Sequence, residues 1–194
     1  MANSDNDNYF KLGLALLSTM LFASACSVKL TDIEKEGITF VREIEKMARD
    51  VYTYLYNKWG TAIMNSISQS EQVHMDIVKT LIDEYKMSDP VGNNDFGVFT
   101  NHDLQQLYYD LTKQGDASEI DALTIGAMIE EIDIIDIQKY LAQADEDDID
   151  TAYNTLIEGS SNHLRIFVSA LSDKDVDYQP KYLSQDAYDA IINR

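Results

Sequence analysis

Hydrophobic and polar residues repeat along most of the chain with the three-and-four spacing of amphipathic helices. The pattern predicts long helices at residues 31–59, 61–88, 118–144 and 147–172, and short helices at 101–115 and after Ser184. We see no strand-like alternation of useful length. Four helices of similar length, joined by two tight turns and one long connection, predict an all-α four-helix bundle.

The ends of these helices carry recognisable signals. Thr31 and Glu34 have the spacing of a capping box, and Gly60 suits the position that follows a helix. The pair Asp89-Pro90 disfavours further helix, and residues 88–101 are rich in turn-forming residues. We therefore expect a long crossover between the second and third long helices, and it should contain the short helix at 101–115.

Polar residues interrupt the apolar stripes of the four long helices. Glu71 and His74 fall in the middle of the second stripe, where an unpaired polar group costs several kcal/mol. Glu130 lies at the centre of the third stripe and His163 at the centre of the fourth. On the first helix, Glu45 and Tyr52 lie near the edge of the stripe and on the same side, whereas Glu43 lies well outside the stripe. On the third helix, Glu131 flanks the stripe and Asp133 lies further round the helix.

These polar residues also agree in depth. Glu45 lies about fifteen residues before the first turn, and Glu71 and His74 lie about ten to fourteen residues after it. Glu130 lies about fifteen residues before the second turn, and His163 about seventeen after it. With a rise of about 1.5 Å per residue, each hairpin brings its polar groups to a similar level.

Each residue taken alone has a simpler explanation. A single histidine on an apolar face is usually a hydrogen-bonded core residue, and a glutamate at a stripe edge usually extends to solvent. The joint pattern on four helices instead favours metal binding. Carboxylates and imidazoles suit iron, manganese or zinc, and bridging glutamates can hold two cations.

Composition narrows the classes of function. The chain has 194 residues, enough for one domain with a sizeable core, and its net charge of −19 argues against nucleic acid as a partner. Cys26 is the single cysteine, so an intrachain disulfide and a cysteine-ligated metal cluster are excluded.

The N-terminal segment has the features of an export signal. Residues 12–25 (LGLALLSTMLFASA) form an apolar run that is short for a membrane span and ends in small residues before Cys26. Residues 23–26 (ASAC) resemble a bacterial lipobox. We expect a lipoprotein signal peptide at 1–25, a linker at 26–30 and one domain at 31–194, with a lipid anchor on Cys26 and a location in the bacterial cell envelope. An ordinary signal peptide or an N-terminal anchor is the alternative.

Four segments resemble the ferritin-like proteins, and more closely their rubrerythrin-related group. Residues 45–52 (EKMARDVY) resemble the first-helix pattern E-x-x-A-R-x-x-Y, and residues 70–75 (SEQVHM) the second-helix pattern E-x-x-H. Residues 126–133 (GAMIEEID) and 163–167 (HLRIF) are similar to the third and fourth helices. From about residue 31 onward, the chain resembles a ferritin-like family called domain of unknown function 2202.

The resemblance implies a four-helix bundle with a carboxylate-bridged metal site, usually di-iron, that reacts with oxygen or peroxide or oxidises iron. The implied metal ligands are five residues that the stripes also single out: Glu45, Glu71, His74, Glu130 and His163. Tyr52 would be a catalytic residue that donates a hydrogen bond to a metal ligand or relays electrons. Glu130 and Glu131 are alternatives for the third-helix ligand, and Glu71 and Glu130 are alternatives for the bridging carboxylate.

One departure from the family pattern concerns the fourth helix. A complete E-x-x-H there would place a glutamate at position 160, where this chain has Ser160. The chain also cannot carry the cysteine-ligated iron domain of rubrerythrin, so the electron donor is unknown. A homo-oligomer is possible. Two functions therefore stand at this point. The first is a metalloprotein with peroxidase, oxidase or ferroxidase activity, and the second is a non-enzymatic helical lipoprotein with a degenerate metal site.

Overall fold

The computed structural model describes residues 29–194, and all of the regular secondary structure in this part is helical. The helices are α1 (Asp32–Trp59), α2 (Ala62–Glu84), α3 (His102–Gly115), α4 (Glu119–Leu141), α5 (Asp147–Ser172) and α6 (Gln185–Ile192). The predicted all-α bundle is confirmed. The expected signal peptide and the expected anchor at Cys26 lie outside the described residues.

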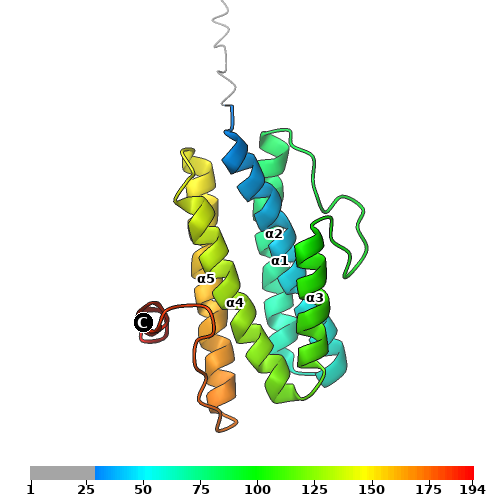
Figure 1. Ribbon diagram of the computed structural model, residues 1–194, viewed down its shortest axis with the longest axis vertical. Helices are drawn as coiled ribbons and strands as arrows, with labels where there is room; N and C mark the ends of the chain where they lie inside the picture. The colour runs from blue at the N-terminus through cyan, green and yellow to red at the C-terminus, as the bar shows by residue number, and fades with distance from the viewer. Residues whose placement is uncertain (1–28) are drawn as a thin grey trace, which may run out of the picture.

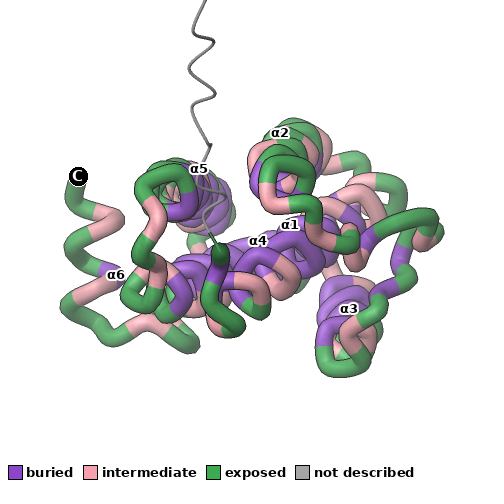
Figure 2. The backbone as a smooth tube through the Cα atoms, turned by 90° about the horizontal axis from the view of Figure 1, so that it is seen from above, coloured by how far each residue is buried: buried purple, intermediate pink, exposed green. Residues whose placement is uncertain are grey.

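The long helices form two antiparallel hairpins, α1 with α2 and α4 with α5, that pack side by side (Figure 1). Between the hairpins, α1 contacts α4 and α2 contacts α5. Because α2 and α4 run in the same direction, residues 85–118 must return the chain to the opposite end of the bundle. Within this crossover, α3 packs outside the bundle against α1 and α4. The C-terminal helix α6, which follows α5, lies against α5 on the other side of the bundle (Figure 2).

The helix ends follow local chemistry. The Thr31 hydroxyl accepts the Glu34 N–H at 3.2 Å and Glu34 accepts the Thr31 N–H at 2.8 Å, which is the predicted capping box. α2 ends earlier than the sequence suggested, because Lys86 adopts a left-handed conformation with φ of 55°. The Met87 N–H then bonds to the Ile82 carbonyl at 2.9 Å, which closes the helix.

The apolar core divides into two clusters with a polar layer between them. On α1, Val41 belongs to the cluster near the N-terminal end and Ile44 to the other cluster. On α5, the first cluster ends at Leu156 and the second begins at Leu164. On α2 and α5, the gap between the two clusters contains Glu71, His74 and His163. On α1 and α4, Glu45 and Glu130 lie within about one helical turn of the gap, so the fold brings these residues to a similar level. Within residues 29–194, no helix combines the length and the hydropathy that a membrane span requires.

Candidate metal centre

The four long helices bring all five predicted ligands together. α1 contributes Glu45, α2 contributes Glu71 and His74, α4 contributes Glu130 and α5 contributes His163. The three glutamates are fully buried, and the two histidines are 5% and 6% exposed. Their role as metal ligands stays a prediction, but the described chain has buried carboxylate and histidine clusters that could hold a metal ion.

The five residues form two sets of potential ligands. In the first set, His74 Nδ1 lies 2.7 Å from Glu71 Oε2 and 3.2 Å from Glu45 Oε2. In the second set, His163 Nδ1 lies 2.8 Å from Glu71 Oε1 and 3.5 Å from Glu130 Oε2. Within each set, one ligand atom from each residue lies within 4.8 Å of the others.

Glu71 is shared by the two sets, with one carboxylate oxygen facing each histidine. The imidazole rings of His74 and His163 stack with their centroids 5.5 Å apart and an interplanar angle of 28°. Glu130 belongs to the second set alone. Of the two residues considered for a bridge, Glu71 is therefore the one that both sets of potential ligands share.

The protons on the two imidazole rings cannot provide a hydrogen bond to every carboxylate oxygen of this cluster. Each Nδ1 atom carries at most one N–H, yet each faces carboxylate oxygens from two different residues. Within residues 29–194, Glu45 Oε1, Glu130 Oε2 and both oxygens of Glu71 are buried without a hydrogen bond of good geometry. Buried carboxylates in this condition are costly, and a cation is a natural way to compensate them.

The titration behaviour reflects the same crowding. Burial raises the pKa of Glu45 to about 8, although His74 opposes the shift. Burial would lower the pKa of His74, but Glu45 and Glu71 outweigh it and raise the pKa to about 11. For Glu71, the two histidines overcome the effect of burial and lower the pKa to about 2. A cation that enters the cluster must therefore displace protons.

Hydrogen bonds from outside the two sets orient two of the predicted ligands. His163 Nε2 lies 2.9 Å from the Ser70 hydroxyl. When the proton of the neutral imidazole is on Nε2, the lone pair of Nδ1 is free to bind a cation. The Tyr52 hydroxyl donates to Glu130 Oε1 at 2.6 Å. Burial and the charge of Glu130 raise the pKa of Tyr52 well above its ordinary value, so it remains a donor. A catalytic role for Tyr52 stays a prediction; the structure shows its contact with Glu130, a predicted ligand.

Glu130 and Glu131 have separate functions in the structure. The Glu131 carboxylate accepts the N–H groups of Lys181, Tyr182 and Leu183 at 2.7–3.1 Å. It also accepts the hydroxyl of Tyr178 at 2.5 Å. Glu131 therefore holds the C-terminal segment, and Glu130 is the residue that α4 presents to the cluster.

Positions 159 and 160 on α5 lie against the cluster. A Cβ atom added to Gly159 would lie 2.4 Å from His74 Nε2, so the glycine makes room for the imidazole. Ser160 is fully buried, and its hydroxyl has no hydrogen-bond partner among the described residues. The carboxylate expected from a complete fourth-helix motif is thus replaced by a short, neutral side chain.

The sequence pattern underestimated the burial of two acidic residues. Glu43 falls outside the apolar stripe, but the crossover covers it, and its carboxylate accepts the N–H groups of Thr100 and Asn101. Asp133 was expected further round α4, but it is fully buried. Its spacing of three residues from Glu130 is the signal that could have linked the two.

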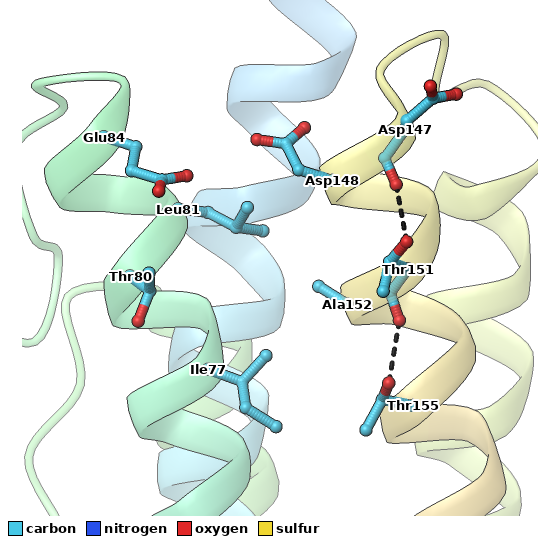
Figure 3. Close-up of a pocket in the computed structure, with 9 residues that line it drawn as sticks. All are labelled: Ile77, Thr80, Leu81, Glu84, Asp147, Asp148, Thr151, Ala152 and Thr155. Carbon is cyan, nitrogen blue, oxygen red and sulfur yellow. Dashed lines mark hydrogen bonds between the residues drawn. The ribbon is translucent and has the colours of Figure 1, made fainter.

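A groove of about 630 Å³ lies between α2 and α5 on the N-terminal side of α5 (Figure 3). Its lining includes the apolar side chains of Ile77 and Leu81, with Asp147 and Asp148 at one end. Ile77 lies about one helical turn beyond His74 along α2. The groove is therefore a separate feature that ends close to the cluster.

The fold and the cluster define a class: a four-helix bundle with a buried carboxylate–histidine centre. A family described as "Uncharacterized protein domain (DUF2202)" matches residues 34–194, and the chain belongs to this family. The predicted membership is confirmed, and the broader likeness to ferritin-like proteins stays a prediction.

A similar protein and a similar solved structure support this assignment. The chain is 46% identical over 164 residues to "Uncharacterized protein MJ0754" of Methanocaldococcus jannaschii. This alignment covers 84% of this chain and 89% of the relative. It is also similar to the crystal structure described as "hypothetical protein MJ0754 from Methanococcus jannaschii DSM 2661". That match has a TM-score of 0.84 and 46% identity, and covers 86% of this chain and 95% of the other.

Proposed function

We propose that the protein binds two divalent metal ions, one on each side of Glu71, and that iron is the working metal. The observation that carries the proposal is the shared Glu71 carboxylate, whose two oxygens face two separate histidines. A bridging carboxylate reduces the repulsion between two neighbouring cations. Glu45 and His74 would complete one position, and Glu130 and His163 the other.

Iron is the metal that the ferritin-like resemblance implies, and the donor set is compatible with it. Oxygen and nitrogen ligands suit iron, manganese and zinc, whereas a thiolate, which the cluster lacks, would point to softer metals. Bound iron would supply redox chemistry toward hydrogen peroxide, dioxygen or ferrous iron. The chain would contribute a dry site, a hydrogen bond from Tyr52 to Glu130 and an orienting contact from Ser70 to His163.

Reaction with peroxide tests the redox part of the proposal. The metal-free protein is loaded with ferrous iron without oxygen and then mixed with hydrogen peroxide in a stopped-flow absorbance experiment. We expect a change in iron absorption that depends on the folded site and is absent from a Glu71→Ala, His74→Ala variant. A loaded wild-type protein whose spectrum does not respond to peroxide or oxygen would contradict a redox function.

A second candidate is a metal site that serves structure or partner binding without turnover. Ser160 favours it, because the α5 position that completes the family motif offers no carboxylate. The same experiment separates the two functions. Tight metal binding without any response to peroxide or oxygen would support the non-enzymatic function.

A further inference from the structure

The cluster comes nearest to solvent at the seam between α2 and α5. Glu45, Glu71 and Glu130 are fully buried, so the slight exposure of the cluster belongs to His74 on α2 and His163 on α5, at 5% and 6%. The other seam between the two hairpins, α1 with α4, is covered by α3, which contacts both helices. Within residues 29–194, the contact between α2 and α5 is also the least extensive of the four that hold the long helices together.

The groove between α2 and α5 leads along this seam toward His74. The two helices are antiparallel, so a step back along α2 and a step forward along α5 lead in the same direction (Figure 1). Ile77 and Thr155 line the groove from opposite walls (Figure 3). About one turn further, the same sides of the helices present His74 and Gly159.

Gly159 leaves a gap in one wall at this point. A Cβ atom at this position would lie 2.4 Å from His74 Nε2, so glycine and imidazole face each other across the seam. Gly159 is itself partly exposed. One turn beyond, the contact of 2.9 Å between Ser70 and His163 Nε2 joins α2 to α5. The open part of the seam therefore runs from the groove to His74 and ends at this contact.

The charge of the groove favours cations. Its lining includes three acidic residues, Glu84, Asp147 and Asp148, and no basic residue. Figure 3 shows Glu84 and Asp148 at the outer end, on opposite walls, with Ile77 and Leu81 further along the α2 wall. A cleft that carries charges of one sign between apolar walls concentrates counter-ions and speeds their association by about 10 to 1,000-fold.

The walls also offer neutral oxygen atoms between the acidic end and His74. The hydroxyls of Thr80, Thr151 and Thr155 each donate to a backbone carbonyl of their own helix at 2.8–3.0 Å. The oxygen lone pairs remain free for a cation. The lining contains no histidine or cysteine that would hold a transition metal on the way. These contacts suit the passage of an ion better than its retention.

We propose that the groove between α2 and α5 is the route by which a divalent cation reaches the buried centre. Glu84 and Asp148 collect the ion, and Gly159 leaves the space through which it reaches His74. The inference rests on the proposed binding of metal and adds the residues that control its entry. Because a route changes the barrier and not the bound state, it governs the rates of uptake and release and leaves the affinity unchanged.

The rate of cobalt uptake tests the electrostatic part of this route. Folded, metal-free protein is mixed with Co²⁺ in a stopped-flow instrument, and the visible absorption of the ion reports uptake; an excess of chelator then reports release. At low salt, the double variant Glu84→Gln, Asp148→Asn should take up Co²⁺ at least about tenfold more slowly than the wild type. Release should slow by the same factor, so that the dissociation constant is unchanged, and added salt should reduce the difference.

A matched control separates the groove from the net charge of the protein. Asp103→Asn, Asp110→Asn removes the same number of charges from exposed positions on α3, which packs against α1 and α4. This double variant should take up Co²⁺ at the wild-type rate.

A bulky side chain in the groove tests the path itself. Thr155→Trp places an indole at the inner end of the groove without touching a predicted ligand, and it should slow both uptake and release. Asn154→Trp, at the neighbouring exposed position outside the groove lining, is the control and should change neither rate. The melting temperature of each metal-free variant shows that it is folded.

The outcomes distinguish this inference from the proposed function. If the groove variants take up Co²⁺ as fast as the wild type, or if the α3 control slows equally, the inference is overturned and metal binding stands. A loss of affinity at an unchanged uptake rate would also overturn it, since the groove would then act on the bound state. If the folded wild type binds no Co²⁺, the proposed function fails, and the inference fails with it.

Discussion

At the scale of single residues, Tyr52 connects the apolar core to the cluster. Its ring packs against Phe167 with centroids 5.4 Å apart, and its hydroxyl donates to Glu130 at 2.6 Å. The contact fixes one Glu130 oxygen and leaves the other, Oε2, directed at His163. Tyr52 thus positions the Glu130 carboxylate within the cluster.

Removing this hydroxyl should weaken metal binding without unfolding the protein. We expect Tyr52→Phe to lower the affinity for the cation beside Glu130 by about tenfold, because a ligand that loses its orienting partner binds less well. The unfolding free energy should fall by about 1 kcal/mol. Tyr85→Phe is the control, since Tyr85 also donates to a carboxylate, Asp148, but away from the cluster. Isothermal titration with Co²⁺ measures the metal affinity of each variant. A Tyr52→Phe affinity equal to that of the wild type would contradict the role of Tyr52.

Metal affinity should rise with pH. The raised pKa values of His74, about 11, and His163, about 10, mean that both imidazoles are protonated in neutral solution when no cation is bound. A cation must displace these protons, so binding releases protons and strengthens from about pH 6 to about pH 9.

Titrations of Mn²⁺ in two buffers with different ionisation enthalpies measure this proton release. His102→Ala is the control, because His102 is exposed and should not change the number of protons released. A metal affinity that is constant or falls from about pH 6 to about pH 9 would contradict the prediction that the metal-free cluster holds protons which the cation displaces.

The sequence singled out the five clustered residues because they interrupt apolar stripes, and it missed the burial of Asp133 for a physical reason. α4 contacts α1, α3 and α5, and the C-terminal segment covers Glu131. A helix buried on several sides has no clear polar face against which a buried acid stands out. The choice between Glu130 and Glu131 likewise depended on a contact with residues some fifty positions later, which no local pattern contains.

At the scale of elements, Glu131 fastens the segment that follows α5. One buried carboxylate gathers three backbone N–H groups, from residues 181–183, and the hydroxyl of Tyr178. This arrangement resembles the capping of a helix N-terminus by an acidic side chain, although here the donors belong to an irregular segment. The segment then leads into α6, which packs on α5.

Replacing Glu131 should release this segment and leave the metal cluster intact. Glu131→Gln keeps one acceptor oxygen and sets an NH₂ group against backbone donors, so we expect a loss of about 2–3 kcal/mol in unfolding free energy and faster proteolysis within residues 173–184. The Co²⁺ stoichiometry should not change. Glu119→Gln, which removes an exposed ion pair with Lys174, is the control and should cost less than about 1 kcal/mol. Loss of a cation from Glu131→Gln would contradict the separate roles of Glu130 and Glu131.

The helix starts were more predictable than the helix ends. Thr31, Asn101 and Ser184 each accept the N–H groups of the following turn, and these caps are local in sequence. α2 instead ends through a left-handed Lys86, a conformation that a lysine rarely adopts and that its sequence does not announce. The burial of Glu43 was equally hidden, because it depends on the path of the crossover.

At the scale of the whole molecule, the polar layer separates two apolar clusters and weakens the metal-free fold. A ligand that binds the folded state alone stabilises it in proportion to its free concentration. At 100 times the dissociation constant, a cation should add about 2.7 kcal/mol. For a domain of this size, the melting temperature should rise by about 5–10 °C.

Thermal unfolding with and without Mn²⁺ checks this effect. The increase should disappear when a chelator is added, and a Glu71→Ala, His74→Ala variant should not show it. A melting temperature that is the same in metal, in chelator and in the variant would contradict a site built into the core.

The central claim is that two cations bind on either side of Glu71, and a crystal structure of the protein loaded with Co²⁺ tests it most directly. Anomalous difference density should show two peaks in the polar layer, one about 2.0–2.3 Å from His74 Nδ1 and the other at that distance from His163 Nδ1, with Glu71 between them. An ordered cluster without any anomalous peak, or with metal bound only at the surface, would contradict it.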